Sequence, residues 1–245
     1  MLSNPIIHAL FERKSVRAFA EKPIAEADKN LIIDAGIQAP SAGNQQLYTI
    51  LDIEDEAVKE RLAVLCDNQP FIAGAPLVFV FLADCGRWQD CYRYAGIQAR
   101  DPGLGDLMLA CEDALIAAQN MVVAAESLGI GSCYIGDILE NREAVTALLR
   151  LLPYVFPVTM LVFGYPADGR DARKKPPRPQ REYLVRKNTY SPLDEQALRK
   201  MHSEIHPGQD FDSFMTAFCA RKYQSGFALE LNRSTRGYLR QFTGQ

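Results

Sequence analysis

The residues best suited to bind a charged ligand form a short basic cluster near the N-terminus. Arg13, Lys14, Ser15 and Arg17 lie within five positions of one another. A guanidinium group binds phosphate oxygens two at a time, and a lysine ammonium adds a point charge. We therefore expect the cluster to bind a phosphate ester. Taken alone, it is more typical of a solvated helix end stabilised by the helix dipole.

Three later segments also carry residues that suit ligand binding. They are residues 41–46 (SAGNQQ), 134–137 (YIGD) and 175–178 (KPPR). Each alone has an ordinary structural interpretation as a turn, a strand end or a charged connector. The order and spacing of all four segments carry the information, and only folding could bring them together.

Composition limits the class of protein. The 245 residues are 48% hydrophobic, enough for one large domain with a substantial core. A net charge of −3 gives no basic field that would attract nucleic acid. No run reaches the roughly 18 apolar residues that a membrane span needs, and the N-terminus lacks a signal-peptide pattern. We expect a cytoplasmic protein with no nucleic-acid or membrane partner.

The cysteines do not form a metal-binding pattern. The chain has six, without a Cys-x-x-Cys pair and without a histidine at short spacing. Cys111 falls in an apolar helical pattern and Cys133 beside a predicted strand, where cysteine acts as a small buried hydrophobe. We expect reduced, non-catalytic thiols and no metal site.

Capping residues and apolar periodicity predict the helices. Asn4 and Pro5 begin the first helix as N-cap and first helical residue. Asn141 and Ser191 are expected to begin two later helices, and Gly129 to end the longest one. The predicted helices cover residues 5–12, 26–38, 107–128, 142–149, 191–206 and most of the basic tail at 211–242.

Apolar runs predict four strands, at residues 47–53, 76–83, 132–135 and 158–163. The second run is continuous, which is typical of a fully buried central strand. Residues 84–106 mix aromatic residues with glycine and proline, which predicts an excursion that packs over another part of the molecule. Trp88, Tyr92 and Tyr94 in it could be packing residues or a substrate wall.

In order and spacing, the four segments resemble the nitroreductase family, specifically its larger NADPH-dependent nitro- and flavin-reductase branch. The resemblance covers about residues 5–190. It implies an α+β fold with a mixed, mainly antiparallel sheet flanked by helices, in an intertwined homodimer with FMN at the interface. It also implies an FMN-binding core over residues 1–190, with the 84–106 excursion over the active site. Residues 191–245 would be a helical arm of the same domain.

The resemblance also implies which residues bind FMN. Arg13 and Ser15 would contact the phosphate, and Arg17 the ribityl chain or the ring. Residues 41–46 would reach the FMN of the opposite subunit, and 134–137 would present backbone amides to N5. The full set is Arg13, Lys14, Ser15, Arg17, Ser41, Asn44, Gln46, Gln69, Tyr134, Ile135, Gly136, Asp137, Lys175 and Arg178.

The implied reaction is a ping-pong transfer of hydride from NADPH or NADH, through N5 of FMN, to a small planar acceptor such as a nitroaromatic, a quinone or a free flavin. The flavin carries the chemistry, so no catalytic side chain is expected. Arg221, Arg233 and Arg236 are candidates for the 2′-phosphate of NADPH. A solvated helix face is the other interpretation of these three.

Other functions stay open. The same scaffold could support reductive dehalogenation, flavin fragmentation or dehydrogenation of a bound substrate, with residues 84–106 as a lid. A non-enzymatic flavin-binding sensor or storage protein is a further alternative.

Overall fold

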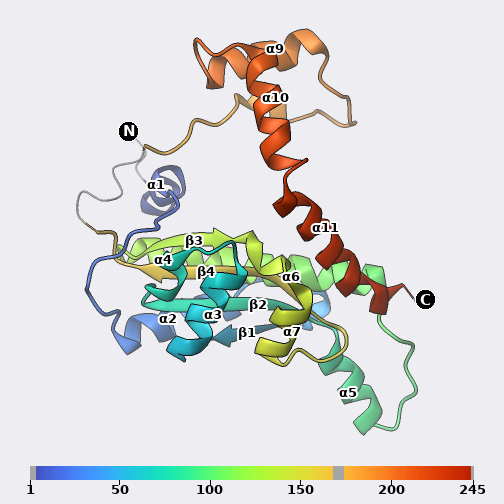
Figure 1. Cartoon of the computed structure of the whole chain (residues 1–245). Coiled ribbons are helices and arrows are strands. Elements are labelled where there is room, and N and C mark those ends of the chain that lie inside the picture. Colours follow the sequence, from blue (N-terminus) through green and yellow to red (C-terminus); the bar gives the residue numbers. More distant parts are fainter. Residues whose placement is uncertain (1–3, 168–173, 244–245) are drawn as a thin grey trace. The chain divides into compact units, whose positions relative to one another are not determined.

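The sheet is built around the continuous apolar run that begins at Leu77. The first seven side chains of this central strand, β2, are buried, as predicted. β2 pairs antiparallel with β1 on one side and with β4 on the other, and β3 pairs antiparallel with the far edge of β4, giving the order β1-β2-β4-β3 (Figure 1). The strands are β1 (Tyr48–Asp52), β2 (Leu77–Asp84), β3 (Gly131–Ile135) and β4 (Val155–Gly164).

The protein is described here by a computed structural model, which covers residues 4–167 and 174–243. The chain divides into two compact units: Met1–Ala172 with Glu230–Gln245, and Arg173–Leu229. The sheet belongs to the first unit. The predicted boundary between a core and an arm after residue 190 stays a prediction.

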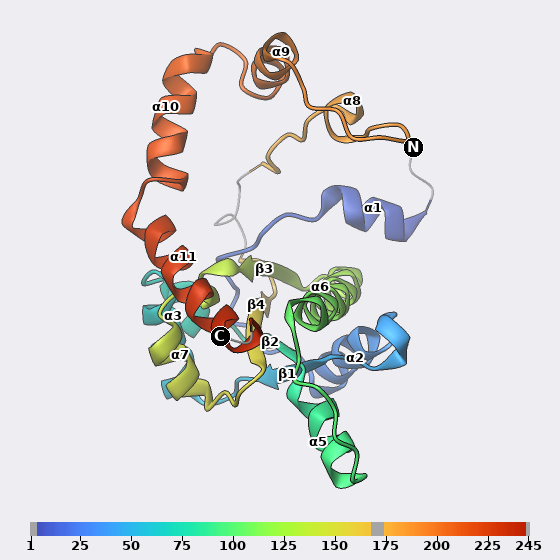
Figure 2. The ribbon, with the colours of Figure 1, turned by 90° about the vertical axis from the view of Figure 1, so that its right-hand side faces the viewer.

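Helices cover both faces of the sheet. Successive side chains of a strand point to opposite sides, so the continuous apolar run of β2 makes both faces apolar. Val78 and Val80 pack in one core cluster with side chains of α3, α4 and α7. Phe79 and Phe81 pack in the other with α2 and α6. Figure 2 shows the sheet between these two layers. The helices of the first unit are α1 (Pro5–Glu12), α2 (Glu26–Ile37), α3 (Glu56–Leu65), α4 (Pro70–Ala73), α5 (Gly86–Tyr94), α6 (Leu104–Ser127) and α7 (Arg142–Leu149).

Within its described residues, the regular structure of the second unit is helical. It contains α8 (Arg181–Leu184), α9 (Glu195–Ile205) and α10 (Phe211–Lys222). The last helix, α11 (Gly226–Leu239), begins in this unit and continues into the first. Short 3₁₀ turns complete the chain: η1 (Ala42–Asn44), η2 (Gly136–Leu139) and η3 (Arg240–Phe242).

Helix α6 is the long central helix that the alanine pattern predicts. Ala110, Ala114 and Ala117 are fully buried, and small side chains let the helix lie close to the sheet. By length and composition alone, α6 could also cross a membrane. Its place in the core cluster with β2 identifies it as a core helix of this fold.

Local capping signals account for several helix ends. The side chain of Asn4 accepts hydrogen bonds from the amides of Ile6 and Ile7, as an N-cap should. Gly129 follows α6 in the left-handed conformation, with φ of 72°, which favours glycine. Both predictions are confirmed.

Two predicted caps are wrong. Asn141 precedes α7 but adopts a left-handed φ of 49°, and its side chain donates to the carbonyl of Leu65 rather than capping the helix. Ser191 does not begin α9: that helix starts at Glu195, where the Asp194 carboxylate accepts the amide of Ala197 at 2.8 Å. In each case another polar group is better placed to satisfy the helix amides.

Candidate functional site

The basic segment of residues 13–17 lies beside strand β3. Ser15 forms a parallel bridge with Ser132, and the amide of Val16 donates to the Ser132 carbonyl at 2.9 Å. Val16 is 4% exposed and packs over Gly131, where an added Cβ would lie 2.5 Å from a Val16 methyl. In an extended segment neighbouring side chains alternate, so Ser15 and Arg17 point away from this contact.

Arg13 carries an unmet hydrogen-bond donor. Its side chain is half-buried beside Tyr134, with Cζ 5.9 Å from the ring centroid. Among the described residues, no acceptor reaches its buried Nε. A buried donor without an acceptor is unfavourable, so this side chain suits a site completed by a negatively charged group.

The turn after β3 brings two further predicted residues into contact. Gln69 Nε2 donates to Asp137 Oδ2 at 2.7 Å and to the carbonyl of Cys66 at 2.8 Å. The two residues before Gln69, Asp67 and Asn68, adopt left-handed φ values of 61° and 51°. This tight turn fixes the Gln69 amide group at the end of β3.

The backbone at Gly136 is open on one side. Gly136 is exposed, and a Cβ added there would meet no atom within 4 Å. The neighbouring Ile135 side chain is 2% exposed and belongs to the core, so only its backbone can face a ligand. Tyr134 donates through its hydroxyl to Gln119 on α6 at 3.2 Å.

The cation of Arg17 lies near the same turn. Arg17 is exposed, and its Cζ is 6.0 Å from the ring centroid of Phe71, two residues beyond Gln69. The structure therefore gathers Arg13, Ser15, Arg17, Gln69, Tyr134, Gly136 and Asp137 along β3 and the turn that follows it. Lys14 lies in the same segment and is half-buried.

The loop of residues 41–46 is held elsewhere on α6. Gln46 donates through its backbone amide and Nε2 to Ser41 Oγ, at 3.1 and 3.2 Å, and through Nε2 to Asn44 Oδ1 at 2.8 Å. Asp113 of α6 accepts the amide of Ala42 at 2.9 Å. Because Asp113 and Gln119 are six residues apart, this loop and Tyr134 contact α6 about 9 Å apart along its axis.

The downstream basic pair lies in the second unit. Lys175 is half-buried and Arg178 is exposed in the irregular segment before α8. Their assignment to a phosphate stays a prediction. Arg221, also in the second unit, has its Cζ 5.3 Å from the ring centroid of Phe218.

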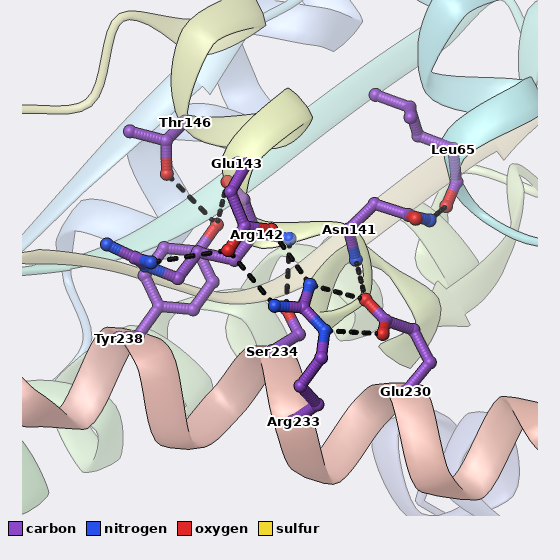
Figure 3. Close-up of polar contacts among 9 residues, drawn as sticks. All are labelled: Leu65, Asn141, Arg142, Glu143, Thr146, Glu230, Arg233, Ser234 and Tyr238. Atoms are coloured by element: carbon purple, nitrogen blue, oxygen red, sulfur yellow. Dashed lines mark hydrogen bonds and ion pairs between the residues drawn. The ribbon is translucent and has the colours of Figure 1, made fainter.

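Arg233 of α11 belongs to an ion-pair network with α7, shown in Figure 3. Its guanidinium donates to both carboxylate oxygens of Glu143, at 3.0 and 2.8 Å, and to both of Glu230, at 2.7 and 2.9 Å. Arg236, one turn on, is exposed. In this structure Arg233 anchors a helix, and its assignment to NADPH stays a prediction, as does that of Arg236.

Glu140 is a titratable residue near the site that the sequence analysis missed. It is 6% exposed and follows Asp137 by three residues. Burial, and then the negative charges of Asp137, Asp67 and Glu230, raise the pKa of Glu140 to about 7. A single glutamate after a strand carries no sequence signal of burial, so only the fold identifies it.

Three cysteines have raised thiol pKa values: Cys85 and Cys133 are buried and Cys111 is half-buried. Burial raises the pKa of Cys133, beside the basic segment, and raises that of Cys111 to about 11. Burial also raises the pKa of the Cys85 thiol to about 12. A thiol is nucleophilic only as its thiolate, so these three side chains are inert near neutral pH.

Sequence similarity identifies the family to which this fold belongs. The model described as "Nitroreductase family" matches residues 10–165. The chain belongs to the nitroreductase family.

Curated relatives match over most of their length. The chain is 36% identical over 203 residues to an "Oxygen-insensitive NADPH nitroreductase" of Salmonella typhimurium, covering 82% of this chain and 81% of the relative. It is 35% identical over 196 residues to an "FMN reductase [NAD(P)H]" of Bacillus subtilis, covering 78% of this chain and 77% of the relative. Among solved structures, the hypothetical oxidoreductase YcnD of Bacillus subtilis is 28% identical with a TM-score of 0.80, covering 96% and 97%.

Proposed function

We propose that this protein is an FMN-dependent oxidoreductase that uses NADPH or NADH to reduce small planar acceptors, namely nitroaromatics, quinones or flavins. The relatives named NADPH nitroreductase and FMN reductase support this activity. The observation that carries the cofactor assignment is the buried Arg13 Nε, which has no acceptor among the described residues. The phosphate of FMN would complete the hydrogen bonding of this half-buried side chain.

The residues around β3 fit the rest of the cofactor. Ser15 and Lys14 would assist Arg13 at the phosphate, and Arg17 would approach the ribityl chain or the ring. The open space over Gly136 leaves room for a planar group to approach the backbone. Gln69, held by Asp137 and the Cys66 carbonyl, would bind a polar ring edge. Lys175 and Arg178 are proposed phosphate ligands on the family resemblance.

When bound, FMN supplies hydride transfer through its N5 atom. The residues of the chain would position the cofactor and set the charge around it. The exposed guanidinium of Arg17 would stabilise negative charge that develops on a reduced ligand. The backbone of residues 135–137 would offer amide donors at the open end of β3. Arg221, Arg233 and Arg236 remain proposed contacts for the 2′-phosphate of NADPH.

We also propose a homodimer, with Ser41, Asn44 and Gln46 completing the FMN site of the other subunit. Its support is an apolar stripe on the outward face of α6. This stripe consists of Met108, Leu109, Leu115 and Ile116, which are 59%, 43%, 44% and 40% exposed. A second copy of the chain would bury them. The six free cysteines support a reducing, cytoplasmic location.

The cofactor assignment is tested by replacing Arg13. Arg13→Ala removes the unmet donor and the positive charge, so the Kd for FMN should rise by about tenfold or more. Quenching of flavin fluorescence during titration measures the Kd. Arg61→Ala, at an exposed position on α3, is the matched control and should bind FMN like the wild type. Equal affinity in both variants would refute the role of Arg13.

A further inference from the structure

The loop of residues 41–47 is held in an unfavourable backbone conformation. Gly43, Asn44 and Gln46 all adopt left-handed φ values, of 57°, 56° and 46°. Asparagine adopts this conformation more readily than most residues, whereas for glutamine it is strained, and a strained residue persists only where its surroundings impose it. Contacts from outside the loop add to the hydrogen bonds that its own residues make.

Asp113 is the first of these. Its side chain comes from the core helix α6 and is 2% exposed. Oδ1 accepts the amide of Ala42 at 2.9 Å, and Oδ2 accepts the amide of Leu47 at 3.0 Å. One buried carboxylate thus joins the beginning and the end of the loop. Hydrogen bonds from amides to a carboxylate are stronger than those to neutral acceptors.

Side chains of helix α5 donate hydrogen bonds to backbone carbonyl groups of the same loop and of the residue that follows it. The indole nitrogen of Trp88 donates to the carbonyl of Gln45 at 3.0 Å. Nη2 of Arg87 donates to the carbonyl of Tyr48 at 3.2 Å and also to that of Gln46. Asp113 thus accepts hydrogen bonds from the loop's amide groups, and α5 donates hydrogen bonds to its carbonyl groups, so the loop is held from two sides.

We propose that Asp113, together with Arg87 and Trp88, is a positioning residue for the flavin site. It fixes the strained loop so that Ser41, Asn44 and Gln46 are oriented before FMN binds. This inference rests on the proposed function. It assigns residues 86–94 of the predicted excursion a role in holding the loop, beside any role toward the substrate.

The test compares Asp113→Asn with Asp55→Asn. Asp55 is the matched control because its carboxylate also accepts two backbone amides, those of Ala57 and Val58, at the exposed start of α3. In Asp113→Asn one carboxylate oxygen becomes an NH₂ group, which faces an amide donor instead of accepting from it. We expect faster hydrogen exchange across residues 42–47 in the protein without flavin, and unchanged exchange in the sheet.

Two further readouts separate positioning from general stability. Trp88 is the only tryptophan in the chain, so its fluorescence emission reports directly on the loop. We expect this emission to shift in Asp113→Asn but not in Asp55→Asn. FMN should bind about tenfold more weakly to Asp113→Asn, a factor that corresponds to about 1.4 kcal/mol.

A second variant covers the case in which Asp113→Asn does not fold. Trp88→Phe removes the indole donor and part of the ring at a half-buried position, and it should also raise loop exchange and the Kd for FMN. Wild-type exchange and affinity in the folded variants would overturn the inference while leaving the proposed function intact. If the wild type itself failed to bind FMN, the proposed function would fall and the role toward FMN with it, whereas loop exchange would still report whether Asp113 holds the loop.

Discussion

The ionisation of Glu140, near the end of β3, makes the stability of the fold depend on pH. Its pKa is raised to about 7 from the ordinary value of 4.5, chiefly by burial. Between these two values the folded state holds a proton that the unfolded chain has released. The contribution of Glu140 to stability therefore falls as the pH rises through this interval and then levels off.

Glu140→Gln should remove this dependence, because glutamine is neutral at every pH. Relative to the wild type, the variant should gain up to about 3 kcal/mol above pH 7, and nothing below about pH 4.5. Urea unfolding at both pH values measures the difference. The same change at exposed Glu60 should give no pH-dependent gain. If the difference in unfolding free energy between Glu140→Gln and the wild type were the same at pH 8 as at pH 5, the raised pKa of Glu140 would be contradicted.

Single residues also show what the sequence could reveal about the site. Arg13, Ser15 and Arg17 were identifiable because their types and spacing match a family pattern, and the fold places them together. Asp113 was not identified, although a charged residue inside an apolar helical pattern is a usable signal of buried hydrogen bonding. The contact of Gln69 with Asp137 depends on how two loops meet, which no local pattern encodes.

Among the elements, α7 shows why some helix ends resist prediction. The amide of Asn141 donates to Glu230 at 3.1 Å, and that of Arg142 to Ser234 at 3.0 Å. Both acceptors lie on α11, about ninety positions later in the chain, as Figure 3 shows. A cap supplied by tertiary contact leaves no mark near the helix, whereas Asn4 caps α1 from the adjacent position.

The buried strand β2 was predictable because continuous apolar residues suit a strand covered on both faces. Helices α3 and α5 were not predicted. The sequence of α5, with its glycine and aromatic residues, is typical of a loop, and its first turn is held by tertiary contacts. The carboxylate of Asp84, just before the helix, accepts the amides of Gly86 and Arg87, both at 3.1 Å; the tertiary contact is the Thr49 hydroxyl, which donates to the same carboxylate at 2.7 Å and holds it in place.

Within the first unit, the part of α11 from residue 230 onward is held by aromatic contacts as well as by ion pairs. Tyr238 is 3% exposed and meets Phe156 edge to face, with centroids 5.3 Å apart. Tyr238→Ala should lower the free energy of unfolding by about 3 kcal/mol or more. Tyr190→Ala, at an 87% exposed position, should change it by less than about 0.5 kcal/mol. Chemical denaturation compares the two, and equal effects would contradict the packing role.

For the whole molecule, the proposed homodimer depends on the apolar stripe on α6. We expect the wild type to have a solution mass of twice 27.4 kDa by light scattering. Ile116→Asp places a charge in the proposed interface and should shift the protein toward the monomer, because a buried unpaired charge is strongly unfavourable. Leu152→Asp, at a 72% exposed position outside the stripe, should remain dimeric. A monomeric wild type would refute the homodimer.

The central claim is that the groups around β3 bind a flavin that accepts electrons from a nicotinamide. The most direct measurement is the visible absorption spectrum of the purified protein, supplemented with FMN, before and after anaerobic addition of NADPH. The account predicts a bound flavin band that NADPH bleaches and that a nitroaromatic acceptor restores. A protein that retains no FMN, or whose flavin band NADPH and NADH leave unchanged, would contradict it.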